Sequence, residues 1–264
     1  MTGKTGKIAV FDSGMGGVSF LPLAMKMLPH ENFIYYGDLK NAPYGEQTPQ
    51  FIKNRVSEIF DFFIEQDAKI IVIACNTATS AAVKYLRAKY KNLTILGMEP
   101  AIQLAAKNGE KDIVILSTPI TSCAPNTLRL IEENRAKAHA VSIPCGGLMD
   151  LVENNEGLSM AENKKQLTAY LKQRLKGVVD EDSDCAMILG CTHYIFLRNL
   201  LSELYPKVRL YDGNEGTARN LRRHLEEKNL LNPSLELGSV EFFSSVDNAE
   251  FTAKAKSFMA RLEY

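Results

Sequence analysis

The fold of this chain is decided by the stretch Lys69-Ile-Ile-Val-Ile-Ala-Cys75-Asn76-Thr77-Ala78-Thr79-Ser80. Its run of apolar, mostly β-branched residues predicts a strand that is buried on both faces. The residues that follow are rich in alanine and place Val83 and Leu86 at helical spacing, which predicts a helix. We therefore expect Cys75 at the carboxyl end of a strand and directly before a helix, where open α/β sheets bind their ligands.

A second stretch repeats this order of features. Residues 186–194, with the sequence Ala-Met-Ile-Leu-Gly-Cys-Thr-His-Tyr, combine an apolar strand, a small residue, Cys191 and a threonine. A helix is predicted after them, over residues 195–204. Free backbone N–H groups and the helix dipole favour a thiolate over a thiol at such a turn. Two cysteines on equivalent turns of two similar units suggest a pair that faces each other across one cleft.

Strand and helix patterns alternate along the whole chain, which predicts the α/β class with mainly parallel sheets flanked by helices. Thr48 followed by Pro49 is typical of the start of a helix. The other predicted strands cover residues 7–11, 32–36, 94–97, 112–116, 139–143, 208–212 and 240–243. The other predicted helices cover residues 20–28, 49–63, 101–107, 127–136, 162–175, 215–228 and 248–262.

The pattern restarts near residue 98, which suggests an internal duplication. We expect two pseudo-symmetric domains with an active site in the cleft between them. The first domain is predicted to be discontinuous, with residues 1–97 and 207–264, because the last strands and helix can complete it. The second domain is predicted to cover residues 98–206.

Composition and charge limit the classes of function. Lys plus Arg equals Asp plus Glu, at 31 each, so nothing favours a nucleic-acid or membrane surface. The five cysteines are scattered and odd in number, which favours reduced thiols in a cytosol over a disulfide framework. The polar N-terminus lacks the pattern of a signal peptide, and no apolar run approaches the roughly 20 residues that span a bilayer. We expect a cytoplasmic protein that acts on a small molecule.

The glycine run Gly14-Met-Gly16-Gly17 follows a strand and has Asp38 at the end of the next strand, as in a dinucleotide-binding fingerprint. The third glycine of that fingerprint would fall at residue 19, which is serine. Asp12 would also place a carboxylate beside the pyrophosphate. We therefore disfavour a nicotinamide cofactor, and expect Asp12 to orient or deprotonate a neighbouring group and Ser13 to bind ligand.

A zinc site formed by Cys185, Cys191 and His193 is also disfavoured. The chain has no paired C-x-x-C, and Cys185 falls inside or before a strand rather than at its end. We expect Cys185 and Cys123 to be inert core residues. His193 differs from the other three histidines because it lies beside a cysteine, with whose thiol it can exchange a proton.

Two thiols without a cofactor suit the inversion of a carbon centre, which needs a base on one face and an acid on the other. Each cysteine can be thiolate in one direction of the reaction and thiol in the other. Loop amides and hydroxyls would then stabilise the carbanion-like state. Asp12 and Glu153 are candidates to tune the protonation of the pair, although the residues alone favour a solvated acid at a helix end for Glu153.

The chain resembles the glutamate racemase family, within the wider aspartate/glutamate racemase superfamily. The matching stretches are residues 11–17, 37–38 with Pro43-Tyr44-Gly45, 74–79 and 189–194. They cover the first three-quarters of the chain in the family's order. The chain departs from the family's usual residues at Ser117, Gly146 and Ile195.

This resemblance implies cofactor-independent interconversion of L- and D-glutamate by a homodimer, to supply D-glutamate for peptidoglycan, cell-wall biogenesis and cell shape. It implies that Cys75 removes the α-proton of D-glutamate and that Cys191 removes that of L-glutamate. Asp12 would assist Cys75, while His193 and Glu153 would assist Cys191. The residues implied to bind substrate are Ser13, Pro43, Tyr44, Gly45, Asn76, Thr77, Thr118, Thr121 and Thr192.

Three other functions remain open at this point. A racemase of aspartate or another acidic amino acid would carry the same two thiols. A non-catalytic amino-acid-binding protein would keep the cleft but would not need both cysteines and His193. A thiol redox protein would need two cysteines close together, whereas a racemase must keep its thiols separated by the substrate.

Overall fold

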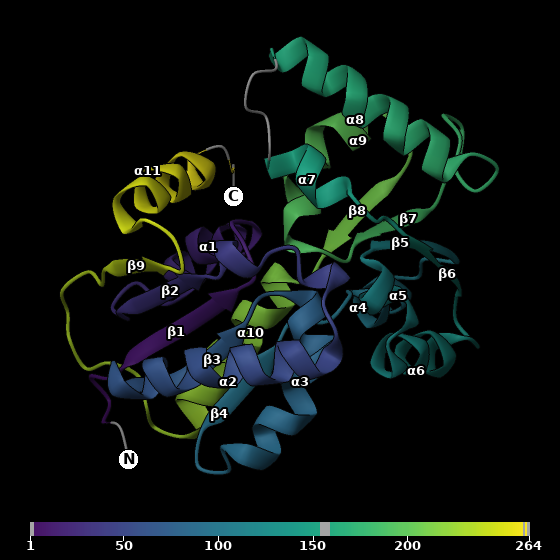
Figure 1. Cartoon of the computed structure of the whole chain (residues 1–264). Coiled ribbons are helices and arrows are strands. Elements are labelled where there is room, and N and C mark those ends of the chain that lie inside the picture. Colours follow the sequence, from purple (N-terminus) through teal and green to yellow (C-terminus); the bar gives the residue numbers. More distant parts are fainter. Residues whose placement is uncertain (1–2, 154–158, 261, 263–264) are drawn as a thin grey trace. The chain divides into compact units, whose positions relative to one another are not determined.

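The computed structural model describes residues 3–153, 159–260 and 262 (Figure 1). The chain forms two compact units. Unit 1 contains the residues up to Met98 and those from Asn214 onward, and unit 2 contains Glu99–Gly213. Each unit is built on one sheet whose paired strands all run parallel. The predicted α/β class is therefore confirmed.

The sheet of unit 1 has the strand order β4-β3-β1-β2-β9. Its members are β1 (Lys7–Asp12), β2 (Phe33–Gly37), β3 (Ala68–Ile73), β4 (Thr94–Gly97) and β9 (Val240–Ser244). Every residue of β3 is buried, as its unbroken apolar sequence predicted. The edge strand β9 comes from the C-terminal part of the chain and pairs with β2.

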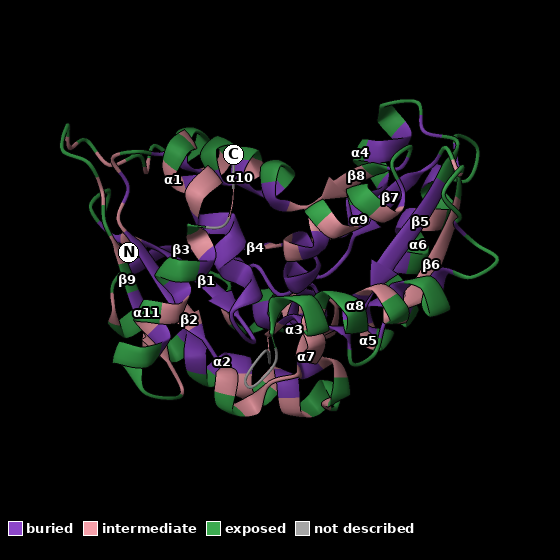
Figure 2. Cartoon of the chain, turned by 90° about the horizontal axis from the view of Figure 1, so that it is seen from above, coloured by how far each residue is buried: buried purple, intermediate pink, exposed green. Residues whose placement is uncertain are grey.

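Helices cover both faces of this sheet. They are α1 (Leu21–Met27), α2 (Pro49–Glu65), α3 (Asn76–Lys89), α10 (Asn214–Glu227) and α11 (Asn248–Met259). Figure 2 shows α1 and α10 on one side of the buried strands and α2 on the other. The start of α2 matches the prediction, because the Thr48 side chain accepts a hydrogen bond from the Phe51 N–H at 3.2 Å and Pro49 is the first helical residue.

Unit 2 has the strand order β6-β5-β7-β8. The strands are β5 (Asp112–Ser117), β6 (His139–Pro144), β7 (Ala186–Leu189) and β8 (Arg209–Asp212). Its α-helices are α4 (Ile102–Lys107), α5 (Pro119–Cys123), α6 (Pro125–Asn134), α7 (Leu148–Glu153), α8 (Met160–Leu175) and α9 (Arg198–Leu204). Small and β-branched residues of β5, β7 and α4 form a buried core between them.

The pairing of β8 differs from the expected division of the chain. We placed residues 207–264 with the first domain, but β8 pairs with β7 in the second sheet. Residues 207–213 therefore belong to unit 2. A strand of four residues carries too little sequence pattern to show which sheet edge it joins.

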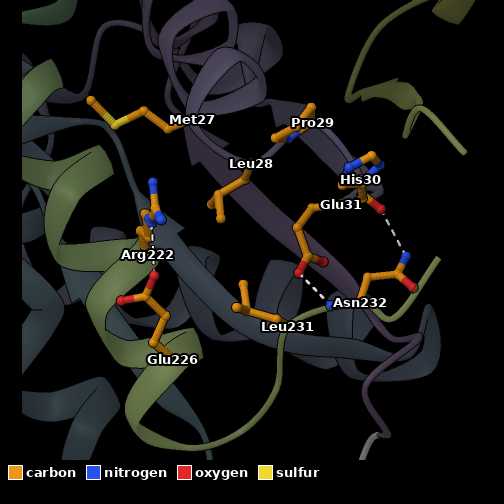
Figure 3. A pocket seen from close by; sticks show the side chains of 9 residues that line it. All are labelled: Met27, Leu28, Pro29, His30, Glu31, Arg222, Glu226, Leu231 and Asn232. Carbon is orange, nitrogen blue, oxygen red and sulfur yellow. Dashed lines mark hydrogen bonds and ion pairs between the residues drawn. The ribbon is translucent and has the colours of Figure 1, made fainter. Parts of the chain in front are cut away.

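The segment between α10 and β9 is tied to the rest of unit 1 by polar contacts. A pocket of about 310 Å³ lies beside it, lined by the end of α1 and the turn that follows, by α10 and by this segment (Figure 3). The Asn232 N–H donates to the Glu31 carboxylate at 2.8 Å, and its side-chain amide donates to the His30 carbonyl at 2.8 Å. The buried Lys69 ammonium also lies 2.6 Å from the Glu31 carboxylate. The C-terminal part of unit 1 is thus held by a buried ion pair.

Across the described part of the chain, no helix combines the length and apolar character needed to cross a bilayer.

Candidate active site

Cys75 lies where the sequence predicted, between the end of β3 and the first residue of α3. It is the N-cap of α3, and its Sγ accepts a hydrogen bond from the Ala78 N–H at 3.4 Å. The Ser13 Oγ lies 3.3 Å from the same sulfur. A thiolate at this position can accept both hydrogen bonds, and it is further stabilised by the positive end of the helix dipole.

Asp12 ends β1 and is completely buried. Its Oδ1 accepts a hydrogen bond from the Gly14 N–H at 2.9 Å. A Cβ placed on Gly17 would lie 2.6 Å from the Cβ of Asp12, so a glycine is needed where the 3₁₀ helix η1 (Gly16–Phe20) crosses this carboxylate. The close packing of Gly17 on Asp12 therefore explains why residue 17 is a glycine, and no bound dinucleotide is needed to explain it.

Asn76 and Thr77 are the first residues of α3, and both are buried. The Oδ1 of Asn76 has no hydrogen-bond partner within the described residues. Leaving a buried amide oxygen without a donor is costly, so such an atom is suited to receive a donor from a ligand. An ammonium group is a ligand group of this kind.

Tyr44 begins the short 3₁₀ helix η3 (Tyr44–Glu46), for which Pro43 is the N-cap. Its hydroxyl donates to Oδ2 of the buried Asp38 at 2.7 Å, and its ring packs against Phe11 with 6.0 Å between the ring centroids. Burial and the neighbouring Asp38 carboxylate raise the pKa of Tyr44 far above its ordinary value. The phenol therefore stays protonated and donates to Asp38.

Cys191 follows β7, separated from it by Gly190, and precedes a helical segment that is less regular than predicted. The segment starts as the 3₁₀ helix η4 (Thr192–Leu197) and becomes α-helical only in α9. A Cβ on Gly190 would lie 2.8 Å from the Leu116 carbonyl oxygen, so this turn needs a glycine. Cys191 is buried, as Cys75 is.

A chain of contacts links Cys191 to two further predicted residues. Nδ1 of His193 lies 3.8 Å from the Cys191 sulfur, and Nε2 of His193 lies 2.5 Å from Oε1 of Glu153. Burial alone would lower the pKa of His193, but the Glu153 carboxylate and the Cys191 thiol outweigh it and raise this pKa well above the ordinary value. His193 is therefore a cation that can donate toward Cys191, and Glu153 is its counter-ion rather than a solvated acid.

Three predicted threonines lie near the carboxyl ends of β5 and β7, all of them buried. Thr118 is the N-cap of α5, and its Oγ1 accepts from the Thr121 N–H at 3.3 Å. The Thr118 hydroxyl also donates to the Thr121 hydroxyl at 3.1 Å. Thr192 directly follows Cys191. Unit 2 thus presents hydroxyl groups at the same sheet edge as its cysteine.

The structure adds residues that the sequence reasoning missed. A hydroxyl cluster joins the buried Ser117 and Ser122 with the partly buried Ser142, with 2.7 Å between the first two side-chain oxygens and 3.1 Å between the last two. The sequence signal that could have indicated this cluster was the serine at position 117, where the family usually has glycine. Arg55, which binds Asp38, was also missed, because a single arginine on a predicted helix gives no signal of its own.

The remaining cysteines have other surroundings. All five cysteines are free thiols, in agreement with the prediction. Burial raises the pKa of Cys145 to about 11, so it remains a thiol. Cys185 is buried as expected, but Cys123 is exposed at the end of α5, so its prediction as a core residue was wrong. Within residues 3–153, 159–260 and 262, no three His, Cys, Asp or Glu side chains gather as metal ligands would.

Two parallel sheets, each carrying a buried cysteine at a strand-to-helix turn, point to a racemase class. The chain belongs to the Asp/Glu/hydantoin racemase family, whose model matches residues 22–221. It is 40% identical over 247 residues to the glutamate racemase of Clostridium botulinum, covering 93% of each chain.

Solved structures agree with this assignment. The glutamate racemase isoform RacE1 of Bacillus anthracis superposes with a TM-score of 0.85 at 28% identity, covering 97% of this chain and 95% of that one. Escherichia coli glutamate racemase, in complex with L-glutamate and the activator UDP-MurNAc-Ala, superposes with a TM-score of 0.76 at 28% identity. That superposition covers 96% of this chain and 95% of the other.

Proposed function

We propose that this protein is an isomerase that interconverts L- and D-glutamate by a cofactor-independent, two-thiol mechanism. The observation that carries the proposal is that Cys75 in unit 1 and Cys191 in unit 2 are both buried at a strand-to-helix turn, each with its own hydrogen-bonding partners. The similarity to glutamate racemases over nearly the whole chain selects glutamate among the acidic amino acids. A racemase of aspartate is the less supported alternative.

In the direction from L- to D-glutamate, the Cys191 thiolate takes the α-proton. The Cα–H bond breaks, an S–H bond forms, and the electron pair delocalises into the α-carboxylate. The Cys75 thiol then donates its proton to the opposite face of Cα, which leaves Cys75 as a thiolate. The reverse direction exchanges the roles of the two sulfur atoms. This mechanism requires that Cys75 and Cys191 flank one substrate.

The surroundings of each sulfur suit these roles. The Ala78 N–H and Ser13 hydroxyl can stabilise the Cys75 thiolate, and we propose that Asp12 assists Cys75. The His193 cation, held by Glu153, can stabilise the Cys191 thiolate. We propose that the substrate's carboxylates and ammonium bind Ser13, Pro43, Tyr44, Gly45, Asn76, Thr77, Thr118, Thr121 and Thr192.

The cellular role proposed from this activity is the supply of D-glutamate for peptidoglycan, and hence for cell-wall biogenesis and cell shape. We further propose that the enzyme is cytoplasmic and acts as a homodimer. Sedimentation of the purified protein tests the dimer directly.

The decisive experiment is exchange of the α-proton in D₂O, measured by NMR with each glutamate enantiomer separately. Wild type should exchange and racemise both. Cys75→Ser and Cys191→Ser should each lose racemisation by about 10² to 10⁴, the usual contribution of a placed acid–base group. Cys75→Ser should retain more exchange on L-glutamate, and Cys191→Ser should retain more on D-glutamate. Undiminished racemisation by either variant would refute the two-thiol mechanism. Faster racemisation of aspartate than of glutamate by the wild type would refute glutamate as the substrate.

A further inference from the structure

Asp38 is a buried carboxylate that lies beside the candidate site without being one of its predicted members. It directly follows β2, is fully buried, and its backbone N–H donates to the Asp12 carbonyl at 3.1 Å. Its side chain accepts hydrogen bonds from the Tyr44 hydroxyl at 2.7 Å and from the Asn41 amide at 3.0 and 3.1 Å. Asp38 therefore connects the turn at the end of β1 with the segment Pro43–Gly45.

Arg55, on α2, supplies the positive charge that offsets the cost of burying this carboxylate. Its Nε and Nη2 each lie 2.9 Å from one oxygen of Asp38, which is a bidentate pair. Burial would raise the pKa of Asp38, but the hydrogen bonds from Arg55, Tyr44 and Asn41 outweigh it and lower this pKa. Asp38 thus stays ionised and can only accept, which fixes the direction of the hydrogen bond from Tyr44.

The outer side of the Arg55 guanidinium faces a different environment. Its Nη1 donates to Glu58 at 2.7 Å, and its Nη2 donates to the Tyr36 hydroxyl at 3.2 Å. Arg55 also lines an open pocket of about 640 Å³, together with Lys40 and Phe51. Because the guanidinium is reachable from this pocket, a guanidinium ion from solution can enter the space that removal of the arginine side chain leaves.

We infer that Arg55 is a positioning residue for substrate binding, which acts through Asp38 to hold Tyr44 and the segment Pro43–Gly45 in place. The inference rests on the proposed function of that segment as part of the glutamate site. The side-chain hydrogen bonds of Arg55 go to Asp38, Glu58 and Tyr36 and to neither cysteine, so we assign it to substrate binding rather than to proton transfer. Its loss should therefore affect binding of glutamate more than turnover.

The first test is Arg55→Ala. The KM for glutamate should rise about tenfold, as expected for the loss of one charge-assisted interaction, while kcat changes much less. Guanidinium chloride, at concentrations far below denaturing ones, should restore the KM, and sodium chloride at equal ionic strength should not. Arg55→Lys should restore it only in part, because an ammonium cannot form the bidentate pair.

The matched control is Arg223→Ala, since Arg223 pairs with Glu227 on the surface of α10 in the same unit. It should leave the KM unchanged with or without guanidinium. A second arm places Arg55→Ala in a Tyr44→Phe background, where its effect on KM should shrink because the hydroxyl that Asp38 holds is already gone. An unchanged KM in Arg55→Ala, or equal effects in both backgrounds, would overturn the inference.

Hydrogen exchange separates this inference from the proposed function. The Glu46 and Gln47 N–H groups donate to the carbonyls of Pro43 and Tyr44 at 3.3 and 3.2 Å. Both should lose protection in Arg55→Ala whatever the enzyme's substrate is. Lost protection in a protein that does not racemise glutamate would contradict the proposed function alone. Full protection with wild-type racemisation would contradict the inference alone.

Discussion

The two candidate catalytic cysteines receive their hydrogen bonds from different kinds of group. The Cys75 sulfur accepts a hydrogen bond from a helix N–H and lies 3.3 Å from the Ser13 hydroxyl oxygen. Cys191 has a histidine that carries its own carboxylate partner. The donors that face the two sulfur atoms therefore differ: a helix N–H and a hydroxyl group on one side, and a buried histidine on the other. A substitution of His193 or Glu153 therefore changes the surroundings of Cys191 without removing a hydrogen-bond donor of Cys75.

At the scale of single residues, we predict that Glu153→Gln lowers the pKa of His193. Without the carboxylate, burial dominates and favours the neutral imidazole. NMR titration of the imidazole signals checks this, with His224 of the other unit as a control that should titrate alike in both proteins. A His193 signal that titrates equally high in Glu153→Gln would contradict the prediction.

The sign of the accompanying pH dependence follows from linkage. The native pKa of His193 lies above the unfolded value of about 6.5, so its contribution to stability is fully present below that pH. The contribution is lost as the pH rises through the raised native pKa. The difference in the free energy of unfolding between wild type and Glu153→Gln should thus be largest in weak acid, between about pH 4.3, where a glutamate ordinarily ionises, and about pH 6.5, and should shrink as the pH rises further.

At the scale of elements, the turn between β7 and η4 depends on the absence of a side chain at Gly190. In Gly190→Ala the new methyl group would lie 2.8 Å from the Leu116 carbonyl and 3.1 Å from the Cβ of Ser117, so the backbone must shift. We predict a loss of about 1–3 kcal/mol in the free energy of unfolding. Racemisation should fall as well, because Cys191 is the next residue.

Gly216→Ala is the matched control for this change. Gly216 lies in α10, and nothing stands within 4 Å of its ideal Cβ. Alanine should stabilise the helix by about 0.5–1 kcal/mol. Urea unfolding of both variants measures the two effects, and equal stability of Gly190→Ala and wild type would contradict the prediction.

The elements also show what a single sequence can and cannot predict. The strands were found nearly to the residue because apolar runs between polar breaks are a local signal, as in Thr94–Gly97. The short helix α7 was missed, since six residues after a glycine pair show no helical period. The helix that ends at Glu153 therefore had no predicted bounds, and the contact of Glu153 with His193 depends on chain folding between residues far apart in sequence. The same holds for the pair of Asp38 and Arg55.

At the scale of the molecule, contacts of the Lys69 side chain hold the C-terminal part of unit 1 against its sheet. This ammonium is buried, lies 2.6 Å from Glu31, and donates to the carbonyls of Lys4 and Leu230 at 2.6 and 2.9 Å. Glu31 in turn accepts from the Asn232 N–H (Figure 3). One ion pair thereby holds the first strands and the segment after α10 together.

We predict that Lys69→Met lowers the free energy of unfolding by about 3–5 kcal/mol, because it leaves the buried Glu31 carboxylate without a counter-ion. Adding Glu31→Leu should recover most of this loss. Lys164→Met, which breaks an exposed pair with Glu203, should cost no more than about 1 kcal/mol. Urea unfolding measures the free energy of unfolding of all three variants. A loss in Lys69→Met as small as that in Lys164→Met would contradict the prediction.

The position of β9 beside β2 has a consequence for biosynthesis. The ribosome releases β2 early, whereas its neighbour β9 emerges only after the whole of unit 2 has been made. Until then a nascent chain carries an open strand edge, which is a template for pairing with other chains. Translation arrest ahead of residue 240 should accordingly yield insoluble polypeptide, and holdase chaperones should associate with it in preference to the finished enzyme.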